Sequence, residues 1–160
     1  MSDNFLRFVP VNPESSPGDA ETAAGIEVLV AAFPDSDVVE AESHDSVQFI
    51  DCGGNFESVR CPQCRADLLE DGSWGQMMNT ARASGMAERR FDLPCCGAST
   101  ALEDLAYFWP VAFGRLSLDV RNPGVRCFHS DGEPSEFENA LLSKLRTALG
   151  TEVSAHWQHL

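Results

Sequence analysis

The stretch "RLSLDVRNP", residues 115–123, contains the pattern on which the fold prediction depends. Leu116 and Leu118 alternate with polar residues, which is typical of a β-strand with one buried face. A shift of 110 positions places Leu6 on Leu116 and Phe8 on Leu118, and an Asn-Pro pair follows the strand in both copies. Because Asn-Pro is also common turn chemistry after a strand, the internal repeat stays a hypothesis at this point.

A helix and a second strand are predicted after the first of these strands. The helix is capped by Asp19 and ended by Pro34. Its buried face is predicted from apolar residues at helical spacing, namely Ile26, Leu29, Val30 and Phe33. Residues 38–50 then predict a hairpin that turns at "SHDS".

The C-terminal copy is predicted to repeat this order. Ser135 and Glu138 form a capping box for a helix that ends at Gly150, and a last strand includes Trp157. Two strand–helix–strand units around a cysteine-rich middle indicate an α+β class. We predict a ferredoxin-like split βαβ sandwich with an antiparallel sheet, formed by one domain of residues 1–160 with a zinc-ribbon-like insertion at 52–98.

Two helices are predicted in the middle of the chain. Ser73 with Gln76 and Thr100 with Glu103 each match a capping box. Pro110 would end the second of these helices.

Four cysteines in this middle segment have the chemistry of a metal site. Cys61 and Cys64 form a Cys-Pro-x-Cys hook, and Cys95 and Cys96 precede Gly97. Four thiolates are a ligand set that zinc prefers, and such a closed site is structural because it leaves no position for water. We therefore predict one structural Zn²⁺ held by these four residues.

Three alternatives to this ligand set stay open. Adjacent cysteines reach one ion only through an unusual backbone, so Cys52 in "DCGGN" could replace Cys95 as the fourth ligand. The cluster could also be free core cysteines, or a redox Cys-x-x-Cys. The redox reading fits less well, because a redox motif would open a helix whereas "CPQCRADLLEDGS" continues into a polar turn.

The segments "FIDCGGNFESVRCPQC", "LPCCGAS" and "YFWPVAFGRLSLDVRNPG" resemble a family of small zinc-ribbon-like bacterial proteins, frequent in actinobacteria. The resemblance covers residues 47–124 and implies a shared pattern of a CPxC hook and a PCCG hook. Some members carry a label that suggests a sugar-transporter ATPase. This chain, however, contains no Gly-x-x-x-x-Gly-Lys-Ser/Thr loop for a phosphate.

The charge of the chain is −14 and is concentrated in the first sixty residues, which hold twelve acidic residues against two arginines. This field repels phosphate backbones and anionic lipids and attracts basic surfaces. We expect a basic protein partner, no nucleic acid and no membrane. No apolar run is long enough for a membrane span, and the first residues do not form a signal peptide, so we expect a cytoplasmic protein.

These features favour a non-enzymatic, zinc-stabilised acidic protein-binding module, of the adaptor, regulator or toxin-neutralising type. The alternative is a small cysteine-dependent enzyme that uses Cys52 or Cys127 with a histidine. The four histidines are His44, His129, His156 and His159. His129 follows Cys127 by two residues, but no third group that would orient the pair is identifiable.

Overall fold

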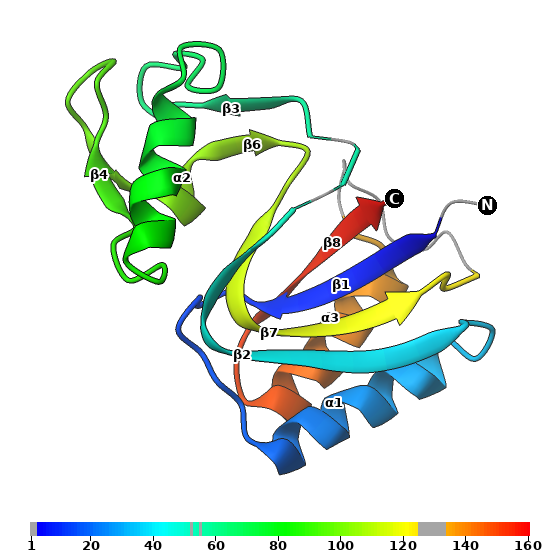
Figure 1. The fold of residues 1–160 in the computed structure, drawn as a ribbon. Coiled ribbons are helices and arrows are strands. Elements are labelled where there is room, and N and C mark those ends of the chain that lie inside the picture. Colours follow the sequence, from blue (N-terminus) through cyan, green and yellow to red (C-terminus); the bar gives the residue numbers. More distant parts are fainter. Residues whose placement is uncertain (1–2, 52, 55, 125–133) are drawn as a thin grey trace.

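A computed structural model describes residues 3–51, 53–54, 56–124 and 134–160. Its main body is a four-stranded sheet with the order β2-β7-β1-β8, in which all neighbouring strands are antiparallel. Helices α1 and α3 lie on the same face of this sheet (Figure 1). The elements of this body are β1 (Asn4–Pro10), α1 (Asp19–Ala32), β2 (Val38–Ile50), β7 (Ala112–Arg121), α3 (Glu136–Leu149) and β8 (Val153–His159). The predicted α+β class and antiparallel sheet are therefore confirmed.

The pairing of the two central strands agrees with the internal repeat. Phe8 of β1 lies directly opposite Leu118 of β7. These are also the residues that the shift of 110 positions places on each other. The local twofold relation between β1 and β7 is therefore centred on this pair.

The apolar face of the sheet packs against α1 and α3. As predicted, Leu6, Phe8, Leu116 and Leu118 are buried in one cluster with Leu141, and Ile26 packs against it. Two predictions for this helix were wrong. Val30 is 53% exposed, and Asp19 is the first residue of α1, after Gly18, with no side-chain capping bond.

The face of α1 that meets the sheet is centred instead on Gly25 and Leu29. A Cβ atom at Gly25 would lie 2.7 Å from Leu118 Cδ1, so the missing side chain lets helix and sheet approach closely.

The predicted hairpin over residues 38–50 was also wrong. Both halves of this segment pair with β7, and they form the single strand β2 with a bulge between Ser43 and Gln48. The residues between Ser43 and Gln48, which include His44, Asp45 and Ser46, therefore form the bulge instead of a turn. Arg115 donates from Nη2 to the Asp45 carbonyl oxygen at 2.7 Å, which ties the bulge to β7.

The chain between β2 and β7 forms a second body beside one end of the sheet (Figure 1). It contains two small antiparallel pairs, β3 with β6 and β4 with β5, and the helix α2. Their bounds are β3 (Ser58–Arg60), α2 (Ser73–Ala83), β4 (Arg90–Asp92), β5 (Ser99–Ala101), the 3₁₀ turn η1 (Leu102–Asp104) and β6 (Ala106–Phe108).

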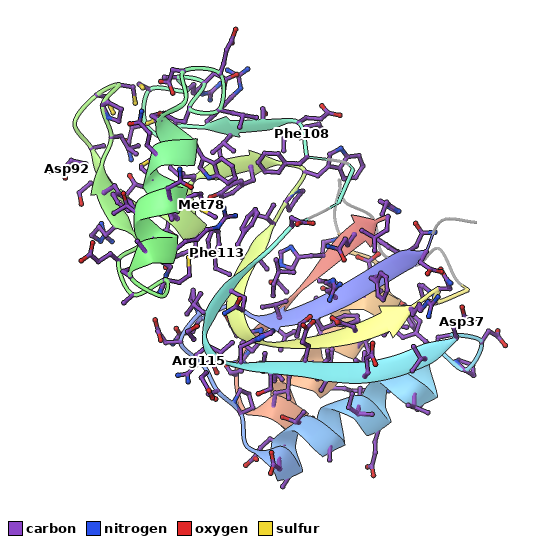
Figure 2. The ribbon with its side chains drawn as sticks, in the orientation of Figure 1. Asp37, Met78, Asp92, Phe108, Phe113 and Arg115 are labelled. Carbon is purple, nitrogen blue, oxygen red and sulfur yellow. The ribbon has the colours of Figure 1, made fainter. Side chains whose placement is uncertain are left out.

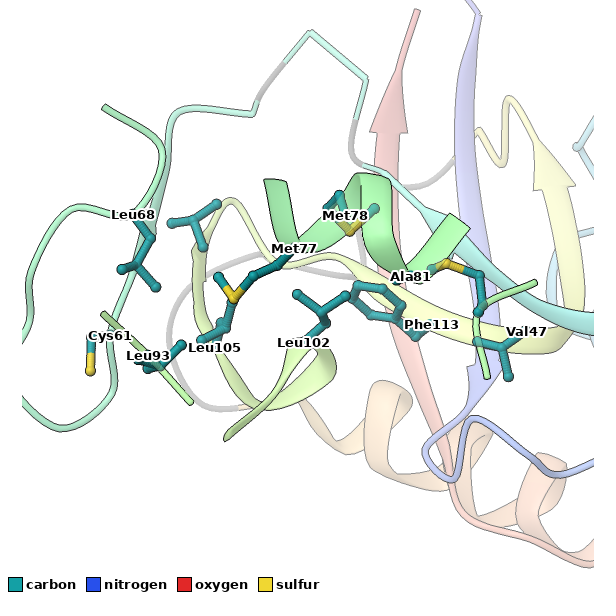
Figure 3. Close-up of a cluster of buried hydrophobic side chains, with 12 residues drawn as sticks. Val47, Cys61, Leu68, Met77, Met78, Ala81, Leu93, Leu102, Leu105 and Phe113 are labelled. Atoms are coloured by element: carbon teal, nitrogen blue, oxygen red, sulfur yellow. The ribbon is translucent and has the colours of Figure 1, made fainter. Parts of the chain in front are cut away.

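This body shares a second apolar core with the ends of β2 and β7. Met77, Met78 and Ala81 of α2 pack there with residues that reach from Val47 to Phe113. Figure 3 shows Val47 at one end of this cluster, and Cys61 beside Leu93 at the other. In the wider view of Figure 2, Met78 lies on α2, and Phe113 lies where the second body meets the sheet.

Two predictions for this middle segment were wrong. Ser73 begins α2 but does not cap it, because its hydroxyl donates to Asp71 Oδ1 at 2.6 Å. The helix predicted to start at Thr100 does not form beyond the short turn η1. Thr100 instead pairs with Phe91 across β4 and β5, and the Leu102 N–H donates to the Arg89 carbonyl oxygen at 2.7 Å.

None of the helices in the described ranges combines the length and apolar character that crossing a bilayer requires.

Candidate metal centre

The four predicted cysteines come together at the end of the second body. Cys61 and Cys64 follow β3, whereas Cys95 and Cys96 lie in the loop between β4 and β5. All four sulfur atoms lie within 4.8 Å of one another. The Cys61 and Cys96 sulfurs are 3.7 Å apart, and those of Cys95 and Cys96 are 3.9 Å apart. This group could hold a metal ion.

The first hook is closed by backbone hydrogen bonds. The Cys61 N–H donates to the Ala66 carbonyl oxygen at 3.0 Å, and the Arg65 N–H donates to the Cys61 carbonyl oxygen at 2.9 Å. Arg65 has a φ of +64°, so the chain turns back through a left-handed residue. Two further N–H groups, from Gln63 and Cys64, donate to the Cys61 sulfur at 3.4 Å each.

The second hook repeats this backbone pattern with different side chains. The Leu93 N–H donates to the Ala98 carbonyl oxygen at 2.9 Å, and the Gly97 N–H donates to the Leu93 carbonyl oxygen at 2.7 Å. Gly97 has a φ of +74°, at the position of Arg65 in the first hook. The segments "CPQCRA" and "LPCCGA" therefore correspond position by position, with Leu93 in the place of Cys61.

Sequence reasoning missed this correspondence. The signal was present in the shared proline at the second position of each hook and the shared cysteine at the fourth. Under this alignment Cys95 corresponds to Gln63, not to either cysteine of the first hook.

The thiols differ in acidity when no ion is bound. The N–H of Cys64, which donates to the Cys61 sulfur, lowers the pKa of Cys61 to about 6. Desolvation by surrounding atoms, followed by hydrogen bonds with the neighbouring thiols, raises the pKa of Cys95 to about 12, although the residue as a whole is exposed. A coordinating cation deprotonates thiols outright. Metal binding is therefore expected to release protons from this cluster.

The structure leaves three of the other candidate residues undescribed and places the rest away from this centre. Cys52, Cys127 and His129 lie outside the described residues, so neither the alternative fourth ligand nor the proposed Cys-His pair is tested. Among the described histidines, none belongs to the cysteine cluster. His44 Nε2 lies 3.4 Å from Glu42 Oε1, and the ring of His159 stacks on Trp157.

A buried polar network on the face of the sheet opposite the helices was not predicted. The alternation in residues 115–123 predicts that the polar Ser117 and Asp119 point to solvent, but both are buried. Arg7 Nη1 lies 2.5 Å from Asp119 Oδ2, and the Ser117 hydroxyl bonds to the other carboxylate oxygen. Arg7 also donates to Gln158 Oε1 from Nη2 at 2.6 Å and from Nε at 2.9 Å.

Burial raises the pKa of Asp119, with Ser117 and Arg7 acting in the opposite direction. Because the Asp119 carboxylate and the Arg7 guanidinium already bind each other and their neighbours, this network fits a structural role in the sheet.

No protein-family model, curated protein or solved structure matches this chain.

Proposed function

We propose that this chain is a non-enzymatic protein-binding module, stabilised by a structural zinc ion, that binds a basic partner. The zinc part is supported by the spacing of the sulfurs. Ligands about 2.3 Å from a tetrahedral zinc ion are about 3.8 Å from one another. The Cys61–Cys96 and Cys95–Cys96 separations of 3.7 and 3.9 Å agree with this value.

The same geometry supports a structural role for the ion. Cys61, Cys64, Cys95 and Cys96 supply four thiolates and therefore fill a tetrahedral shell. When bound, zinc would cross-link the loop after β3 to the loop between β4 and β5. Catalytic zinc sites, in contrast, keep one position for water or substrate.

We infer two finer features of the fold. The strand order β2-β7-β1-β8, with α1 and α3 crossing one face, supports a ferredoxin-like split βαβ sandwich in which the second body replaces a short connection. The two hooks, each at the end of a small antiparallel pair, support a zinc-ribbon-like character for that body.

The observation that carries the binding proposal is the outer edge of β2. Among the described residues β2 pairs only with β7, so its other side offers unpaired backbone groups. Glu40 and Glu42 are exposed on this strand, and Asp37 lies just before it, where Figure 2 labels it. An extended basic segment could pair with such an edge, with its side chains beside the carboxylates.

Charged edges also prevent unwanted strand pairing, so the proposal needs a direct test. We would use the protein as bait in extract from its native cells at low and moderate salt. Charge reversal by Glu40→Lys with Glu42→Lys should abolish capture of a basic protein. The matched control, Glu70→Lys with Glu88→Lys, makes the same charge change at exposed positions of the second body and should preserve capture.

Capture of the same partner by both variants would contradict the proposal. Retention of DNA or RNA at near-physiological salt would also contradict it, because a phosphate backbone would have to approach like charge. Capture that weakens as salt rises would agree with electrostatic steering.

A further inference from the structure

The two hooks have the same backbone but present their cysteines differently. In the first hook the ligands occupy the first and fourth positions, Cys61 and Cys64. In the second hook the first position is Leu93, which is 1% exposed and packs in the apolar cluster of the second body. A leucine side chain has no donor atom for a metal. Within the described cysteine cluster, the second sulfur of this hook therefore comes from the third position, Cys95.

The third position gives its sulfur less support than the first. In the first hook the third position is Gln63. Its backbone N–H donates to the sulfur at the first position, Cys61. At the Cys96 sulfur, the Ala98 N–H acts to lower the pKa of the thiol. In the part of the chain that the structure describes, no backbone N–H donates to the sulfur of Cys95 or of Cys64, and the Cys95 sulfur contacts the Cys96 sulfur at 3.9 Å.

Hydrogen bonds to a ligating sulfur disperse its negative charge and hold the ligand in place. A zinc-bound thiolate without such bonds is more nucleophilic and more easily displaced. Cys95 is also exposed, whereas Cys61 is 1% exposed at the edge of the apolar cluster. Cys64 and Cys96 are exposed too, but each occupies the regular fourth position of its hook.

We propose that Cys95 is the reactive and replaceable ligand of this centre, the thiolate that soft electrophiles modify first. The inference depends on the proposed zinc site. In the reaction with a haloacetamide, the Cys95 sulfur forms a bond to the alkyl carbon, the carbon–halogen bond breaks, and halide leaves. The product is a neutral thioether, which is a weaker zinc ligand than a thiolate. Modification at this one atom would therefore loosen the metal while Cys61, Cys64 and Cys96 stay in place.

The test uses zinc-loaded full-length protein with Cys52→Ser and Cys127→Ser, so that the cluster supplies all the thiols. Limiting iodoacetamide is added, the modified residue is located by fragment-ion mass spectrometry, and released zinc is followed with a chromogenic chelator. Cys95 should be modified roughly tenfold faster than the other three cysteines, with zinc release at the same rate.

Two variants separate reactivity from structure. Cys95→Ser should remove the fast phase of alkylation. Leu93→Cys combined with Cys95→Ala moves the thiol to the position that Cys61 has in the first hook, and this protein should bind zinc and react slowly. Even if this second variant fails to fold, Cys95→Ser still tests the proposal.

First modification at Cys64 or Cys96, equal modification of all four residues, or no modification of the loaded protein would overturn the inference. These outcomes differ from failure of the zinc proposal, because the metal content is measured before iodoacetamide is added. Protein that is folded, reduced and free of zinc would refute both.

Discussion

His156 is half-buried, and its surroundings disfavour the charged form of its ring. Its Nε2 lies 2.7 Å from the Ser154 hydroxyl oxygen, and its buried Nδ1 has no partner among the described residues. Arg7 is its direct neighbour across the β1–β8 pair. Burial lowers the pKa of His156 from 6.5 to about 4.

This depressed pKa predicts acid sensitivity. Between pH 6.5 and 4 the unfolded chain binds a proton at His156 that the folded chain does not. The free energy of unfolding should therefore fall as the pH is lowered through this range, by up to about 3 kcal/mol. His156→Gln should remove this part of the pH dependence, measured by urea denaturation at several pH values.

Acid also protonates any zinc-ligating thiolates, which would lower the stability of parent and variant alike. The slope of unfolding free energy against pH is therefore compared between the variant and the parent. His44→Gln, at the bulge of β2, is the matched control and should preserve the parent slope. An unchanged slope in His156→Gln would contradict the assignment of the acid sensitivity to this ring.

At the scale of the single element, Ser135 determines where helix α3 begins. Its hydroxyl accepts the Glu138 N–H at 3.2 Å, and the helix closes at Gly150, which has a φ of +73°. Ser135→Ala should lower the free energy of unfolding by about 1 kcal/mol, because one terminal N–H loses its acceptor. Ser143→Ala, at an exposed position inside the same helix, should not destabilise the protein. The free energy of unfolding of both variants is measured by urea denaturation. An equal decrease in Ser135→Ala and Ser143→Ala would show that the Ser135 hydroxyl does not stabilise the helix.

A helix could be predicted from the sequence where its capping residues, its apolar spacing and its terminating residue all agree. The box of Ser135 and Glu138, the apolar spacing and Gly150 all agree, and α3 forms where expected. Thr100 and Glu103 match the same box, but strand pairing of Thr100 with Phe91 overrides it. The bulge in β2 was missed for a related reason, since only its pairing with β7 distinguishes it from a turn.

At the scale of the whole molecule, long-range pairing determines the fold. Asn4 lies opposite His159, so strands from the two ends of the chain are neighbours in the sheet. Local periodicity cannot specify such pairing, and here only the repeat of the strand pattern indicated it.

The cysteine cluster was predictable because hook spacing is a local property. The equivalence of Leu93 and Cys61 depends on backbone hydrogen bonds, which composition does not reveal.

The central claim is that zinc holds the second body together, and metal analysis of purified protein tests it most directly. Full-length protein, made without added zinc and kept reduced, should contain one zinc ion per chain, and Cys61→Ser should lose both the metal and much of the stability. Separate Cys95→Ser and Cys52→Ser variants identify the fourth ligand, because only loss of the true ligand should strongly lower zinc affinity. A zinc content near zero in folded, reduced parent protein would contradict the account.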